Sequence, residues 1–175
     1  MQTTIELQPF YSDSPLLLPA TAVYVATWGF DLEDSLDFVS RYAEYSGFYG
    51  LAALSQGQVV AMGFGVLSSP GHWWHDAVAR TIGASHPALQ DAWVLVEICV
   101  LADYRNQEIG TLVHNQLLQT QIYPRALLST RMENNGARRF YEGKGWQYLH
   151  QEIIFDPGDP TYVVMGKEMR PPHHR

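Results

Sequence analysis

Glu97 is the residue whose surroundings most strongly suggest chemistry, because it is a carboxylate inside an apolar run. Residues 93–101 read Trp-Val-Leu-Val-Glu-Ile-Cys-Val-Leu, which predicts a strand that is buried on both faces. Burial raises the pKa of a carboxyl group toward neutrality, and this suits a general base that takes a proton from an amine. A structural acid, paired with an arginine or bonded to backbone N–H groups, is an equally good interpretation.

The turn at residues 105–110 follows this strand and leads into an amphipathic helix expected over 109–121. The first N–H groups of a helix have no partner inside the helix, and the helix dipole favours negative charge there. We therefore expect N–H groups from Asn106 to Thr111 to bind a phosphate of a cofactor. The alternative is an ordinary loop between a strand and a helix.

Three further side chains could take part in chemistry. Cys99 shares a strand face with Glu97, so an acyl-cysteine mechanism is conceivable. No histidine lies near it in the sequence, which favours a buried, inert thiol. His72 and His75 could share one face of a helix and bind a metal, but no third ligand is evident, so we expect no metal.

Strands and helices are both expected, and together they must position these groups. The patterns predict strands at 4–10, 48–54, 59–67, 93–101, 126–130, 146–155 and 162–169, and helices at 20–28, 34–45, 73–82, 109–121 and 135–143. Asp34 is expected to cap the second helix and Gly47 to end it. Two hairpin-like pairs and one strand–helix–strand crossover predict an α/β (α+β) fold, with a mixed, mostly antiparallel central sheet and helices on both faces.

The composition favours one compact domain over residues 1–175. The chain has 46% apolar residues, with residues 70–91 expected as an insert before the central strand and 170–175 as a disordered tail. A net charge of −7 argues against a nucleic-acid partner. A single cysteine excludes an internal disulfide, and the apolar run 16–26 is too short to span a bilayer and lacks a basic start. We therefore expect a cytoplasmic protein without a membrane partner.

Two segments resemble those of a known family. Residues 105–110 read Arg-Asn-Gln-Glu-Ile-Gly, and residues 134–146 read Asn-Asn-Gly-Ala-Arg-Arg-Phe-Tyr-Glu-Gly-Lys-Gly-Trp. The first resembles the Gln/Arg-x-x-Gly-x-Gly/Ala pyrophosphate loop of the GNAT superfamily of acyl-CoA-dependent N-acyltransferases. The second is similar to its Asn-x-x-Ala-x-x-Phe/Leu-Tyr-x-x-x-Gly-Phe segment. The resemblance covers residues 92–155 and implies the GNAT-like acyl-CoA N-acyltransferase fold.

The chain departs from the family pattern at Glu108, where the loop usually has glycine. Glycine permits a close approach of the backbone to phosphate, and a carboxylate beside a diphosphate is repulsive. Glu108 either faces outward in the first turn of the helix, where acids are favourable, or weakens cofactor binding. Gly110 is retained.

The resemblance implies that acetyl-CoA, the acyl donor, lies between two splayed strands. Its pantetheine would bond to the backbone near Val100, and Tyr141 would act as general acid toward the departing thiolate; a core aromatic is the alternative for Tyr141. Asn134 is expected to cap its helix. The implied cofactor-binding residues are Cys99, Val100, Arg105, Asn106, Gln107, Glu108, Ile109, Gly110, Thr111, Asn134, Ala137 and Tyr141.

These observations predict an N-acetyltransferase that moves an acetyl group from acetyl-CoA to a primary amine by direct attack in a ternary complex. The alternatives are a non-catalytic acyl-CoA-binding regulatory or sensor module and an interaction protein that binds no CoA. The acceptor would be a small-molecule or peptide amine. Trp28, Trp73 and Trp74 are candidate walls of its site, as are the loop 28–34 and the turn 156–159. The alternatives for Trp73 and Trp74 are a subunit contact and a lid packed over the sheet, and a homodimer is a further expectation.

Overall fold

The structure is a computed structural model that describes residues 4–169. Its strands are β1 (Ile5–Phe10), β2 (Tyr49–Ser55), β3 (Gln58–Leu67), β4 (Ala92–Val100), β5 (Arg125–Arg131), β6 (Gln147–Ile153) and β7 (Tyr162–Glu168). Its α-helices are α1 (Leu17–Trp28), α2 (Leu32–Ala43), α3 (Trp73–Ile82), α4 (Ile109–Gln119) and α5 (Asn135–Glu142). Two 3₁₀ turns, η1 (Pro87–Leu89) and η2 (Ala102–Tyr104), flank β4. None of the described helices is long and apolar enough to cross a membrane.

The chain divides into two compact units that interleave along the sequence. The first unit contains residues 1–66 and 95–121, and the second contains 67–94 and 122–175. A single domain over 1–175 stays a prediction, and the expected tail at 170–175 lies outside the described residues.

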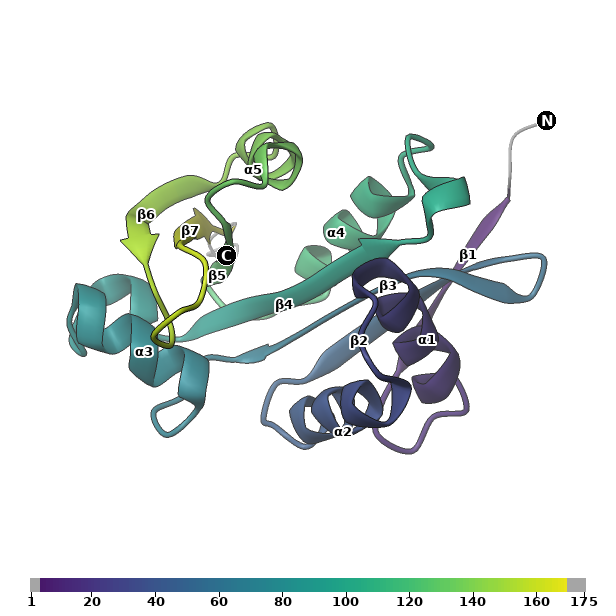
Figure 1. The fold of residues 1–175 in the computed structure, drawn as a ribbon, viewed down its shortest axis with the longest axis horizontal. Helices are drawn as coiled ribbons and strands as arrows, with labels where there is room; N and C mark the ends of the chain where they lie inside the picture. Colours follow the sequence, from purple (N-terminus) through teal and green to yellow (C-terminus); the bar gives the residue numbers. More distant parts are fainter. Residues whose placement is uncertain (1–3, 170–175) are drawn as a thin grey trace, which may run out of the picture. The chain divides into compact units, whose positions relative to one another are not determined.

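The described strands form one seven-stranded mixed sheet in the order β1-β2-β3-β4-β5-β7-β6 (Figure 1). The pairs β1–β2, β2–β3, β5–β7 and β6–β7 are antiparallel, and β4–β5 is parallel. This arrangement confirms the predicted fold class, including the strand–helix–strand crossover from β4 through α4 to β5. The predicted hairpin between β2 and β3 is also present, with positive φ at Gln56 and Gly57, as in the hairpin turns whose twist matches the strands.

In the first unit, β3 reveals which helices cover which face of the sheet. Met62 and Phe64 belong to a buried cluster with residues of α1 and α2. A Cβ atom at Gly63 would instead lie 2.8 Å from Leu117 and 3.0 Å from Val113, both in α4. Because successive strand residues point to opposite faces, α1 and α2 cover one face and α4 covers the other (Figure 1).

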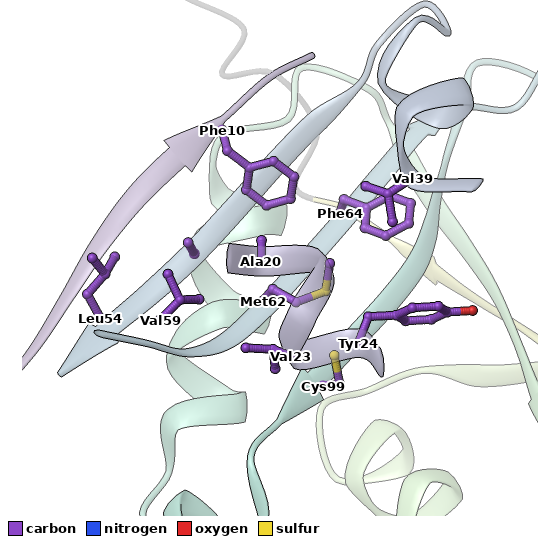
Figure 2. Close-up of a cluster of buried hydrophobic side chains, with 11 residues drawn as sticks. Phe10, Ala20, Val23, Tyr24, Val39, Leu54, Val59, Met62, Phe64 and Cys99 are labelled. Carbon is purple, nitrogen blue, oxygen red and sulfur yellow. The ribbon is translucent and has the colours of Figure 1, made fainter. Parts of the chain in front are cut away.

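Figure 2 shows the buried cluster under α1 and α2. The cluster joins these two helices to four strands, β1 to β4. Cys99 is its member from β4, so α1 and α2 pack against the end of β4 that carries this residue. The members of the cluster are Phe10, Ala20, Val23, Tyr24, Val39, Ala52, Leu54, Val59, Met62, Phe64 and Cys99.

The start of α2 differs from the expectation. Asp31, rather than Asp34, caps the helix: its side-chain oxygen accepts a hydrogen bond from the Asp34 backbone N–H at 2.9 Å. A cap must be extended and lie three residues before the N–H group that it bonds, and Asp31 meets both conditions with φ −68° and ψ 139°. The helix ends at Ala43, so Gly47 lies beyond its end rather than stopping it.

Gly63 is where close packing of the first unit can be tested. Replacing Gly63 with Ala would push a methyl group against α4 and against the Glu97 carbonyl oxygen, which would lie 3.0 Å away. We expect Gly63→Ala to lower the free energy of unfolding by about 1–3 kcal/mol in chemical denaturation. The control is Gly136→Ala in α5, where a Cβ would meet only Asn134 Oδ1 at 3.8 Å. Equal stability of Gly63→Ala and the parent protein would contradict this packing.

Candidate active site

Glu97 lies in β4 with its side chain half-buried, on the same strand face as Cys99 and therefore toward α1. Removal of the carboxyl group from water raises its pKa to about 8, from an ordinary value of 4.5. Hydrogen bonds from the Trp28 side chain and the Ile98 backbone N–H oppose this rise because they stabilise the ionised form. The site thus holds a carboxyl group that titrates near neutral pH.

Trp28 is the residue that the structure brings to Glu97. It is the last residue of α1, and Gly29 ends the helix in the left-handed conformation with φ 74°. The indole ring N–H donates to the Glu97 carboxyl group, while 41% of the residue remains exposed to solvent. Trp28 therefore contacts the candidate base and also presents an aromatic surface beside it.

Cys99 lies close to Glu97, but its environment keeps the thiol protonated. The residue is 4% exposed, and burial raises its pKa well above the usual value; the neighbouring Glu97 carboxylate raises it further. A hydrogen bond with Thr27 and the charge of Arg105 act in the opposite direction and are weaker. The burial that the sequence favoured for this thiol is confirmed, and its raised pKa disfavours the nucleophilic thiolate.

The end of β4 also offers a backbone donor. The N–H of Leu101 bonds to the Val60 carbonyl oxygen of β3 at 2.9 Å. Since alternate N–H groups of a strand point to opposite edges, the N–H of Val100 is directed to the edge of β4 away from β3. The Val100 carbonyl oxygen accepts a hydrogen bond from Arg105 Nε at 3.1 Å, which fixes this side chain at the start of the loop.

The loop before α4 has an unusual backbone. Asn106 and Glu108 have positive φ values of 61° and 63°, in the left-handed region that glycine prefers. Glu108 is exposed, as one of the two alternatives expected, but it precedes the helix instead of lying in its first turn. Glycine in the family pattern therefore suits this position for two reasons: it adopts a left-handed backbone without strain, and it permits close approach to a phosphate.

The residues of this loop fit a diphosphate. The first hydrogen bond of α4 runs from the Leu112 N–H to the Glu108 carbonyl oxygen, and the Glu108 side chain makes no capping bond within the described chain. The N–H groups of Ile109, Gly110 and Thr111 thus lie at the positive end of an eleven-residue helix. Left-handed residues such as Asn106 help to form anion-binding concavities. Gln107, whose side chain bonds to the Asp103 carbonyl oxygen, completes the loop.

Tyr141 lies in α5 of the second unit, where its ring contacts Phe140 at 5.1 Å and Trp146 at 5.7 Å between centroids. Asn134 caps this helix, as predicted, by accepting a hydrogen bond from the Ala137 N–H at 3.1 Å. Arg138 bonds to the Tyr148 hydroxyl group and to the Met132 carbonyl oxygen, so it serves local structure. Glu97 belongs to the first unit and Tyr141 to the second.

The two tryptophans of α3 have different surroundings. Trp74 Nε1 donates to Ser129 Oγ in β5 at 2.9 Å, which ties the helix to the sheet of the second unit. Trp73 is 54% exposed, with its ring 5.1 Å from that of Phe155. Of the two, Trp73 alone keeps the exposure expected of a binding wall.

His72 and His75, which were considered as a possible metal-binding pair, have different surroundings. His75 is buried, with Nδ1 2.7 Å from Ser68 Oγ, and burial lowers its pKa. His72 is the residue that precedes the helix. Among residues 4–169, no group of three His, Cys, Asp or Glu side chains could hold a metal ion.

Sequence reasoning did not single out three residues that lie next to Cys99 or next to its buried cluster: Tyr24, Thr27 and Phe30. Thr27 bonds to Cys99, Tyr24 packs in the buried cluster, and the Phe30 ring lies 5.6 Å from that of Tyr24. Phe30 falls in the loop 28–34 that was predicted as a wall, but no motif marks it. These residues could have been found only by predicting that the C-terminal end of α1 packs on the strand face that carries Glu97 and Cys99.

The fold is shared with solved acetyltransferase structures. An acetyltransferase from Thermus thermophilus is 16% identical, with 96% of this chain and 99% of that chain covered and a TM-score of 0.66. The ribosomal-protein-S18-alanine N-acetyltransferase from Escherichia coli is 14% identical, with 97% of each chain covered and a TM-score of 0.69. An aminoglycoside 6'-acetyltransferase type Ii is 18% identical, with 96% and 99% covered and a TM-score of 0.71. At these identities the likeness shows the fold. No curated protein matches the chain.

The sequence itself supplies the family. Residues 18–146, which include β4, the loop before α4 and α5, match the acetyltransferase (GNAT) family. The match spans well over half of the chain and contains both segments on which the resemblance was based. The chain belongs to the acetyltransferase (GNAT) family and is an acyltransferase.

Proposed function

We propose that the protein transfers an acetyl group from acetyl-CoA to a primary amine by direct attack within a ternary complex. The observation that carries this proposal is the Glu97 carboxyl group, desolvated to a pKa of about 8 and hydrogen-bonded by Trp28. A carboxylate with this pKa is matched to an amine as a proton acceptor near neutral pH. The acceptor is a small-molecule or peptide amine.

The proposed reaction exchanges bonds only between the two substrates and forms no covalent intermediate with the protein. The amine nitrogen attacks the thioester carbonyl carbon, so that a C–N bond forms and the C–S bond breaks. Glu97 takes the proton that the nitrogen loses, either directly or through one water molecule. The N–H of Val100, which points to the edge of β4 away from β3, would donate to the carbonyl oxygen as negative charge develops there.

The departing thiolate requires a proton, and Tyr141 is the proposed donor. This role comes from the match of residues 134–146 to the family segment, in which the tyrosine is an acid. An ordinary phenol has a pKa of about 10, above that of a thiol, so it keeps its proton until a thiolate forms. Direct transfer is preferred over an acyl-cysteine because burial and the neighbouring Glu97 raise the pKa of the Cys99 thiol.

A second candidate function is a CoA-binding sensor without turnover. Glu108 favours this alternative, since the loop that would hold the diphosphate carries a carboxylate and a strained backbone.

A cytoplasmic location also remains a proposal, supported by the single cysteine, which requires no oxidising compartment.

The role of Glu97 predicts a specific pH dependence. Only the ionised carboxylate can accept a proton, so kcat/KM, which reports the free enzyme, should rise about tenfold per pH unit below pH 8 and level off above it. Glu97→Gln should lower kcat by roughly 10²- to 10⁴-fold and abolish the step near pH 8, while acetyl-CoA still binds. The assay is free-thiol release with the best amine from an acceptor screen, and Glu152→Gln, at an exposed position, is the control. A variant as fast as the parent enzyme would refute the base assignment.

The strained loop predicts that two substitutions of Glu108 behave differently. Glu108→Gly removes the charge and the backbone strain, and should raise the free energy of unfolding by about 1 kcal/mol or less. Glu108→Ala removes the charge but keeps the strain, and should bring no such gain. Calorimetric titration should give micromolar acetyl-CoA binding to all three proteins. Equal stabilisation by both substitutions would contradict the strain argument. If none of the three proteins binds acetyl-CoA, both the enzymatic and the sensor proposals fail.

A further inference from the structure

The end of α1 presents aromatic surface beside the candidate base. Trp28 and Phe30 are 41% and 49% exposed, although both are large apolar side chains. Trp28 bonds to Glu97, and the Phe30 ring contacts Tyr24, a member of the buried cluster that also contains Cys99. The two exposed rings are thus anchored to the face of the first unit on which Glu97 lies.

The charges around these rings favour an amine. The Glu97 carboxylate, when ionised, attracts an ammonium group, and aromatic faces do the same through cation–π contact. The described residues in the last turn of α1 include no basic side chain, so the negative end of this helix dipole is not offset there. An ammonium that touches Glu97 would also favour its ionised form, which is the form that accepts a proton.

Three polar side chains next to the rings are engaged within the protein, whereas the carboxylates of Glu33 and Asp34 at the start of α2 are exposed. Thr27 Oγ1 donates to the Val23 carbonyl oxygen at 2.8 Å, and the Cys99 thiol bonds to Thr27. The Asp31 carboxylate accepts from the Asp34 N–H. An apolar body on the acceptor would cover the exposed rings of Trp28 and Phe30 and remove them from water.

We propose that the acceptor is a primary amine carried on an aromatic or branched apolar group, which packs against Trp28 and Phe30 while its nitrogen faces Glu97. This inference rests on the proposed acetyl transfer and names its acceptor class. The rings select the body of the acceptor, and Glu97 selects its nitrogen.

The test compares three amines as acceptors: 2-phenylethylamine, n-propylamine and spermidine. Burial of a phenyl group should raise kcat/KM for 2-phenylethylamine roughly ten- to a hundredfold over n-propylamine, and above spermidine. Phe30→Ser should raise KM for 2-phenylethylamine at least about fivefold, because the lost ring contacts the bound amine, with kcat within about twofold. Leu18→Ser is the matched control: Leu18 is 51% exposed at the opposite end of α1, and its loss should change neither constant.

Binding of 2-phenylethylamine, followed by saturation-transfer NMR, separates the two levels of the proposal. Binding that Phe30→Ser weakens, together with turnover, supports the acceptor class and acetyl transfer. Binding of this kind without acetylation of any of the three amines supports the site but overturns the proposed function. Turnover that favours spermidine, or that gains nothing from the phenyl group, overturns the acceptor class and leaves acetyl transfer intact. Absence of 2-phenylethylamine binding also overturns the acceptor class.

Discussion

The desolvated carboxyl group of Glu97 is the constraint on which the rest of this site depends. A charged carboxylate is costly to bury, and two donors, the Trp28 indole and the Ile98 N–H, meet only part of that cost, so the pKa remains near 8. At pH 7 the protonated form of this carboxyl group therefore predominates in the free protein. The cluster of α1, α2 and β1–β4 holds this arrangement in place, because it fixes both the helix that carries Trp28 and the strand that carries Glu97.

The loop before α4 combines two demands on one short segment. It must turn the chain from η2 into a helix whose first N–H groups can meet a diphosphate, and it does so with left-handed Asn106 and Glu108. For Glu108 this conformation is strained by about 1 kcal/mol or less relative to glycine, whereas asparagine adopts it more readily than other residues with a side chain. Gly110, in contrast, lies inside the first turn of α4. The two glycine positions of the family pattern therefore have different requirements. The first, at Glu108, needs a left-handed backbone, which this chain adopts with a strained glutamate; the second, at Gly110, is helical.

Periodicity and turn signals in the sequence predicted nearly every element, the mixed sheet, the β4–α4–β5 crossover and the Asn134 cap. The errors are local: the cap of α2 is Asp31 because geometry, rather than residue type, chooses between two aspartates. The sequence also marked Glu97 as anomalous, since a charge in an apolar strand is visible without coordinates. It could not reveal that Trp28, 69 positions away, donates to Glu97, or that Arg138 is engaged by Tyr148. Such contacts depend on tertiary packing, which no local pattern encodes.

The central claim is that Glu97 is protonated at neutral pH and ionises near pH 8, with Trp28 as its hydrogen-bond donor. The most direct measurement is a pH titration of the Glu97 side-chain carboxyl carbon by ¹³C NMR, assigned with Glu97→Gln. The structure predicts a midpoint near pH 8 in the parent protein and a higher midpoint in Trp28→Phe, which lacks the indole N–H. A midpoint near the ordinary value of 4.5, unchanged in Trp28→Phe, would contradict the account.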